Sequence, residues 1–299
     1  MKKLKEYIVN IINGFCMSLA DSVPGVSGGT VAFILGFYDK FITSLDDLFR
    51  GSWKKKKEAF KYLIKIGIGW MFGLALAVIF LASLFDKYIY EMSSLFIGFI
   101  IFAIPIVIKE EKDSVKGQYK NIIFAILGAL LVVIVTYLNR VAGNTFNIDN
   151  FNVGTIVYVF LSAMIAISAM ILPGISGSTM LLIFGIYIPI ITKAKAFFSL
   201  DLSVLPILIV FGLGMIFGIL FFTKLLRKSL EKKRSATIYA ILGMMIASIY
   251  SIIMGPTTLK VPKELLTFDK FNILYFIIGG VIILSLEGLK NFLNTKEKE

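Results

Sequence analysis

The sequence has 299 residues, 58% of them hydrophobic and 17% charged, and its formal net charge is +12. Its mean hydropathy of +0.87 exceeds that of soluble globular domains, which predicts an all-α polytopic membrane protein. The absence of histidine and the single cysteine, Cys16, exclude an imidazole base or ligand and an internal disulfide, so we expect a non-enzyme without metal or other cofactor.

The apolar segments follow one another in two series. In the first, over 1–150, we expect a helical hairpin at 7–38 and transmembrane helices at 62–85, 92–108 and 121–138. In the second, over 151–299, we expect a hairpin at 153–190 and transmembrane helices at 204–223, 236–253 and 271–289. The stretch 8–20 is short for a spanning helix, whereas 153–172 is long enough to span. Re-entrant and fully spanning hairpins therefore both stay open.

The second series repeats the first. The stretches 24–38 and 173–187 are identical at eight of fifteen positions, with an offset of 149. Further glycines correspond in the same order: Gly69 and Gly73 with Gly214 and Gly218, Gly98 with Gly243, and Gly128 with Gly279. We interpret the glycines spaced by four residues as helix-packing seams rather than as a site. The sequence therefore predicts two complete copies of one unit.

The distribution of positive charge predicts the orientation of the two copies. If each hairpin enters and leaves on one face, three spans remain in each copy, and this odd number inverts the second copy. Of the 31 Lys and Arg residues, 23 lie on the faces that this topology assigns to the cytoplasm. The positive-inside rule then places both termini in the cytoplasm. Because these charges separate apolar runs, we read them as topology signals and expect no nucleic-acid partner.

Each hairpin contains a Pro-Gly-x-Ser-Gly-x-Thr motif that predicts a broken helix inside the membrane. The incoming helix should stop before the proline, and Pro24 and Pro173 can begin new helices. The N-terminus of such a helix binds phosphate or carboxylate through its free N–H groups. Packing of small residues is the alternative explanation. The predicted phosphate-binding residues are Pro24, Gly25, Ser27, Gly28, Gly29, Thr30, Pro173, Gly174, Ser176, Gly177, Ser178 and Thr179.

Two ionisable residues lie within the apolar segments. Asp21 precedes the first break by one turn, and Met170 occupies its repeat position. We expect Asp21 either to couple a proton or sodium ion to transport or to cap a helix. Lys65 either contacts the lipid headgroup or extends its long side chain to the basic cytoplasmic face.

The residues of the two motifs carry a resemblance to a known family. Ala20-Asp21-Ser22-Val23-Pro24-Gly25-Val26-Ser27-Gly28-Gly29-Thr30 and Leu172-Pro173-Gly174-Ile175-Ser176-Gly177-Ser178 resemble the bacterial polyprenyl-phosphate transporter family. The resemblance covers essentially the whole chain. It implies a flippase of the cytoplasmic membrane that returns undecaprenyl phosphate, the carrier lipid of cell-wall biogenesis, to the cytoplasmic leaflet. It points to the same motif residues and to Asp21.

Three other functions remain as alternatives on the sequence alone. A small-anion transporter or channel would use the same half-helix ends. An intramembrane lipid-pyrophosphate phosphatase would need Ser27 or Ser176 as nucleophile, but no histidine, paired acids or arginines lie nearby in the sequence. A purely structural membrane subunit would not need the doubled motif. The expected partners are the bilayer, an anionic polyprenyl-phosphate lipid and a coupling ion.

Overall fold

The computed structural model describes residues 2–21, 27–76, 88–141, 146–149, 152–258 and 262–295. Within these ranges the chain is helical and contains no strand. The first half contains α1 Lys2–Asp21, α2 Gly28–Ile34, α3 Tyr38–Arg50, α4 Trp53–Leu76, α6 Ile89–Glu110, α7 Lys112–Val115 and α8 Ile122–Val141. The second contains α9 Val153–Ile171, α10 Gly177–Ile183, α11 Tyr187–Phe198, α12 Leu205–Lys232, α13 Arg234–Met254 and α14 Ile273–Thr295. Short 3₁₀ turns at Tyr119–Asn121, Leu202–Val204 and Gly255–Thr258 adjoin α8, α12 and α13.

Six helices of the described part are long and apolar enough to cross a membrane. They are the segments Trp53–Leu76, Ile89–Glu110, Tyr119–Asn139, Val153–Ile171, Leu202–Lys232 and Arg234–Thr257. Helices α10 and α11 form a further apolar pair bent by 109°, as in a broken span or a re-entrant loop. Outward-facing side chains such as Ile126, Leu127 and Ile134 of α8 are about half exposed, which suits contact with lipid. The chain is therefore a multi-pass membrane protein.

The helix bounds differ from the expected spans mainly on the side where the basic residues lie. Helix α4 begins at Trp53, nine residues before the expected span 62–85. Residues 77–85 of that span lie outside the described residues. Helix α12 continues to Lys232, nine residues beyond the expected end at 223. Both extensions carry several basic residues, so they lengthen the helix without lengthening its apolar part.

The two segments expected as hairpins, 7–38 and 153–190, contain the same local turn. Helices α2 and α10 have seven residues each and end in the turns before Gly36 and Gly185. These two glycines have positive φ values of 72° and 68°, which glycine adopts without steric cost. The next helices, α3 and α11, begin at Tyr38 and Tyr187, again 149 residues apart. The repeat in the sequence is thus also a repeat in local structure.

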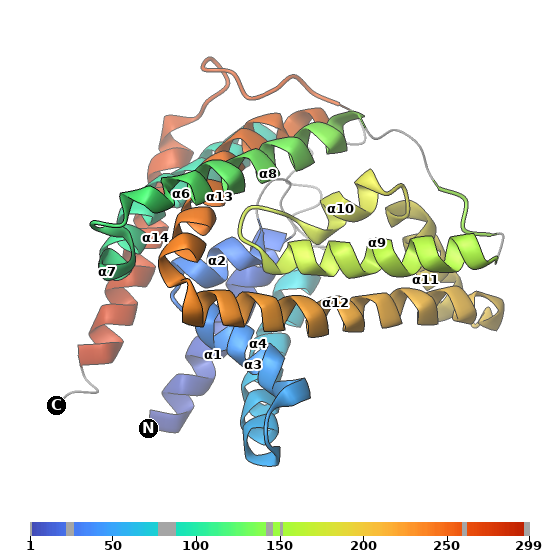
Figure 1. The fold of residues 1–299 in the computed structure, drawn as a ribbon. Coiled ribbons are helices and arrows are strands. Elements are labelled where there is room, and N and C mark those ends of the chain that lie inside the picture. Colours follow the sequence, from blue (N-terminus) through green and yellow to red (C-terminus); the bar gives the residue numbers. More distant parts are fainter. Residues whose placement is uncertain are drawn as a thin grey trace.

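The first helix of each hairpin packs on the helix that follows the hairpin. Helix α1 packs along α4, and α9 along α12; in Figure 1 the α9–α12 pair runs crosswise to α4. A Cβ added at Gly69 would lie 1.9 Å from the carbonyl oxygen of Ile11, and one at Gly214 would lie 2.4 Å from that of Phe160. Ile11 and Phe160 are themselves repeat partners. These glycines are packing seams, as the sequence predicts.

The remaining long helices pair between the two halves. Helix α6 packs on α14, and α8 packs on α13. A Cβ added at Gly98 of α6 would lie 2.2 Å from the carbonyl oxygen of Phe276, and one at its counterpart Gly243 would lie 1.9 Å from that of Ala125. The contact pattern therefore also repeats, with each partner supplied by the opposite half. The inverted orientation of the copies stays a prediction.

One buried core joins the halves beneath the hairpin turns. Tyr38 and Ile42 of α3, Val107 of α6, and Ile238 and Ile241 of α13 are almost inaccessible to solvent. The N-terminal end of α1 and the C-terminal end of α14 lie at the same end of the molecule (Figure 1). The hairpin segments are thereby held between helices from both copies.

Candidate functional site

The first motif opens helix α2. Pro24 and Gly25 lie outside the described residues, and the description resumes at Ser27. Ser27 is the N-cap of α2: its backbone is extended, and its Oγ accepts a hydrogen bond from the N–H of Thr30 at 3.2 Å. This is the usual role of serine at a helix start, because it satisfies an N–H that has no partner within the helix.

The second motif begins with a turn rather than with a helix. Leu172 is extended, as expected for a residue before proline. The prediction that Pro173 begins the next helix is wrong, since α10 begins at Gly177 with Ser176 as its N-cap. The reason lies in Gly174, whose φ of +84° turns the chain in a direction that a helix start does not allow. The Ser176 hydroxyl bonds to that of Ser178 at 2.7 Å and makes no side-chain cap bond.

The two motifs meet directly. The Gly174 N–H donates to Thr30 Oγ1 at 2.8 Å and to Ser27 Oγ at 3.0 Å. The hydroxyls of Ser27 and Thr30 lie 3.1 Å apart, and both residues are fully buried. Ser27 also donates to the carbonyl oxygen of Leu172 at 3.2 Å. We call this cluster of Ser27, Thr30 and Gly174 the motif junction.

Glycines allow the backbones to approach at the junction. A Cβ on Gly29 would lie 2.8 Å from the carbonyl oxygen of Ile171, and one on Gly174 would lie 2.8 Å from that of Met244. Around it, Gly28, Pro173, Ser176 and Gly177 are buried, while Ser178 and Thr179 are partly exposed. The structure thus brings the described residues of both motifs into one buried region, as a paired site requires.

Asp21 is the last residue of α1, and its carboxylate lies at the start of α2, in the first motif. Its carboxylate accepts hydrogen bonds from the Gly28 N–H at 2.7 Å and from Trp70 Nε1 at 3.2 Å. The second copy has no such group, because Met170 packs at the equivalent position, 3.1 Å from where a Cβ on Gly177 would be. Sequence reasoning missed Trp70, although it is one of two tryptophans in the chain.

Lys65 lies beside α1. Its ammonium group is 3.7 Å from a carboxylate oxygen of Glu6 and 3.8 Å from the centre of the Tyr7 ring. These contacts hold the Lys65 side chain beside the N-terminal part of α1, in agreement with an extension toward the basic face. A role for Lys65 in headgroup binding stays a prediction.

Two arginines join the halves through ion pairs. Arg227 of α12 bonds to Asp46 at 3.0 Å and to Asp47 at 2.7 Å, both on α3. Arg234 at the start of α13 bonds to Asp39 of α3 at 2.7 Å and, through Nε, to Glu111 at 3.0 Å. From the sequence, the charges of these arginines are interpreted only as topology signals. We call these six residues, together with Arg50, which bonds to Asp46, the ion-pair layer.

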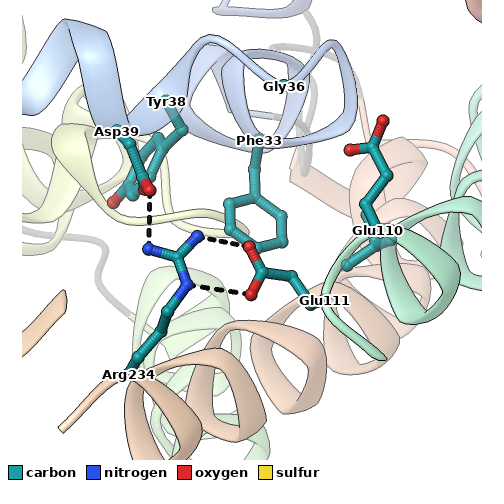
Figure 2. Close-up of a pocket in the computed structure, with 8 residues that line it drawn as sticks. Phe33, Gly36, Tyr38, Asp39, Glu110, Glu111 and Arg234 are labelled. Carbon is teal, nitrogen blue, oxygen red and sulfur yellow. Dashed lines mark hydrogen bonds and ion pairs between the residues drawn. The ribbon is translucent and has the colours of Figure 1, made fainter. Parts of the chain in front are cut away.

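Figure 2 shows the part of the ion-pair layer around Arg234, whose guanidinium group reaches Asp39 on one side and Glu111 on the other. Tyr38 and Phe33 line a cavity of about 100 Å³ beside it. The Tyr38 hydroxyl donates to the carbonyl oxygen of Ile171 at 3.0 Å. Tyr38 therefore connects the surroundings of the ion-pair layer to the end of α9, just before the second motif.

These features define the class of the protein. Spanning helices combined with non-helical backbone and buried hydroxyls, at a contact between two similar halves, are typical of secondary transporters. The halves are connected through polar groups at the motif junction and again at the ion-pair layer.

Comparison with known proteins identifies the family. The model of the VCA0040-like family, described as undecaprenyl phosphate translocase-like, matches residues 17–268. The chain therefore belongs to this family. It is 32% identical over 286 residues to a polyprenyl-phosphate transporter of Staphylococcus aureus, covering 93% of this chain and 95% of the relative. It is 30% identical over 260 residues to one of Vibrio cholerae, covering 84% and 79%. No solved structure matches the chain. The relatives are named as transporters, which agrees with the prediction of a non-enzyme.

Proposed function

We propose that this protein moves undecaprenyl phosphate, or a closely similar polyprenyl phosphate, across the cytoplasmic membrane toward the cytoplasmic leaflet. Its two named relatives are polyprenyl-phosphate transporters. The observation that carries the proposal here is the motif junction, where two buried hydroxyls of the first copy meet a backbone N–H of the second. Carrying a phosphate through hydrocarbon without such polar partners is prohibitively costly.

The phosphate would bind where the two motifs meet. The Gly174 N–H donates to hydroxyl oxygens in the structure, and a phosphate oxygen is a stronger acceptor because charge-assisted hydrogen bonds are stronger. Ser27 and Thr30 could then rotate their hydroxyls to donate to the same phosphate, joined by the partly exposed Ser178 and Thr179. Binding of this kind requires the motifs to separate slightly. Headgroup binding therefore depends on the relative position of the two halves.

Alternating access would follow from that coupling. The headgroup stays near the junction while the halves rock and change which leaflet the site faces. The ion-pair layer joins α3 and α6 to α12 and α13, on the side assigned to the cytoplasm. These ion pairs would have to break whenever the site opens on that side.

Asp21 would link transport to an ion gradient. Its carboxylate accepts the hydrogen bond from the Gly28 N–H. Without Asp21, this N–H could donate to a phosphate. Because two anions compete for this position, we expect headgroup binding to require that Asp21 takes up a proton or pairs with a cation such as sodium.

The test is leaflet exchange of labelled undecaprenyl phosphate in liposomes that contain the purified protein. We expect exchange by the wild type, loss of exchange in the Ser27→Ala, Ser176→Ala double variant, and normal exchange in the surface control Ser203→Ala. No exchange by the wild type under either a proton or a sodium gradient would contradict the proposal. Uptake of free phosphate would then identify a small-anion transporter, and release of phosphate from the lipid pyrophosphate would identify a phosphatase.

A further inference from the structure

A second cavity lies next to the motif junction, between helices of both halves. Its volume is about 340 Å³, at the lower end of the range of about 300–1,000 Å³ that is usual for small-molecule sites. Helices α1, α2 and α6 of the first half and α14 of the second form its walls. Its lining includes Phe15, Cys16, Thr30, Phe96, Phe99 and Ile282. We call this cavity the apolar groove.

The lining restricts the chemistry of an occupant. Of the residues that line the groove, Thr30 carries the one hydroxyl and Cys16 the one thiol, and the others are hydrocarbon or thioether side chains. The rings of Phe96 and Phe99 pack edge to face with centres 5.1 Å apart. A charged or strongly polar ligand would lose its hydration here without gaining partners. An occupant must therefore be hydrocarbon within the groove, and any polar end must lie beyond Thr30, at the motif junction.

Thr30 connects the groove to the proposed phosphate site. Its side chain lines the groove, and its Oγ1 accepts the hydrogen bond from Gly174 at the motif junction. At another wall, Ile282 of α14 lines the groove and is 38% exposed. A chain with a phosphate at Thr30 could thus run through the groove and continue past α14 into the bilayer.

We infer that the apolar groove holds the isoprene units nearest the phosphate of the transported lipid, while the rest of the isoprenoid tail remains in the membrane. This inference rests on the proposed function. An ordinary phospholipid is a poorer match, because its phosphodiester carries a glycerol unit and a second acyl chain and could not approach the buried Thr30 as closely as a phosphate monoester on a single chain. The groove would make transport depend on the isoprenoid as well as on the phosphate.

The single cysteine provides a direct test in the otherwise unmodified protein. Cys16 lines the groove, so its reaction with N-ethylmaleimide in detergent reports whether the groove is filled. We expect polyprenyl phosphate to slow the reaction and an equal concentration of phosphatidylglycerol to leave it unchanged. Equal protection by phosphatidylglycerol would overturn the inference, because the groove would then be a general lipid site.

A matched pair of variants on α14 tests the groove in transport. Ile278 and Ile282 are one turn apart and equally exposed, but only Ile282 lines the groove. We expect Ile282→Trp to slow exchange of the long-chain lipid roughly tenfold by filling the groove, and Ile278→Trp to have no such effect. Exchange that persists in both variants, together with unprotected Cys16, would overturn the inference and leave the proposed function standing. Protection of Cys16 without exchange by the wild type would overturn the proposed function instead.

Discussion

The backbone N–H of Gly174 donates a hydrogen bond of 2.8 Å to the hydroxyl of Thr30, a residue 144 positions earlier in the chain. Each partner belongs to one copy of the repeated motif. Both groups are buried, so neither can exchange this bond for one with water. The position of one half relative to the other thus determines whether this buried hydrogen bond can form.

Replacing this hydroxyl should affect transport more than folding. Thr30→Val keeps the shape of the side chain but leaves Gly174 with Ser27 as its remaining acceptor. We expect a loss of about 1 kcal/mol in the free energy of unfolding and a strong loss of lipid exchange. Thr223→Val is the control, because the buried Thr223 hydroxyl bonds to a carbonyl of its own helix, α12. Equal exchange by the two variants would argue against a role of the junction.

The glycine seams should tolerate alanine only where space is available. Gly69 and Gly214 face carbonyl oxygens of the neighbouring helix, whereas Gly67 and Gly212 have no atom within 4 Å of an added Cβ. We expect Gly69→Ala and Gly214→Ala each to cost about 1–3 kcal/mol or more through overpacking. Alanine at the two open positions should be neutral or stabilising by up to about 1 kcal/mol, since alanine favours helix. Thermal unfolding in detergent measures the difference, and equal behaviour within the pairs would contradict the packing described here.

Substitutions at Asp21 and Trp70 distinguish the effect of the negative charge from the effect of the hydrogen bonds. Asp21→Asn removes the negative charge that holds the Gly28 N–H and Trp70 Nε1, so we expect exchange that no longer responds to a proton or sodium gradient. Trp70→Phe removes one hydrogen bond and keeps the carboxylate, at a cost of about 1 kcal/mol. Exchange by this variant should keep the response of the wild type. A gradient response that survives in Asp21→Asn would assign the coupling to another group.

Exchanging the charges of two partners in the ion-pair layer should restore part of the stability that the first substitution removes. Arg234→Glu places a carboxylate against Asp39 and Glu111, which should lower the melting temperature and disturb transport. Adding Glu111→Arg restores one opposite-charge contact. For such partly exposed pairs we expect a coupling energy on the order of 0.5–1 kcal/mol, smaller at high salt. Additive effects of the two substitutions in a double-mutant cycle would show that the pair does not interact.

The repeat allowed much of the packing to be foreseen. Spacing alone identified Gly69 and Gly214 as seams, and the doubled motif predicted that Ser27 and Gly174 would take part in one site. The exchange of hydrogen bonds between the motifs was not predictable, because it depends on how closely the two halves approach. The partners of Arg227 and Arg234 in the other half lie more than a hundred residues away and are set by the tertiary structure. The prediction for Pro173 was wrong because the left-handed turn at Gly174 delays the helix.

The pairing of α6 with α14 and of α8 with α13 has a consequence for biogenesis. Helices α6 and α8 are synthesised well before the partners on which they pack. During translation, glycine surfaces such as that at Gly98 are not covered by their partner helices until α13 and α14 have been inserted. The newly made first half therefore lacks the packing partners of two of its long helices until the second half has been synthesised.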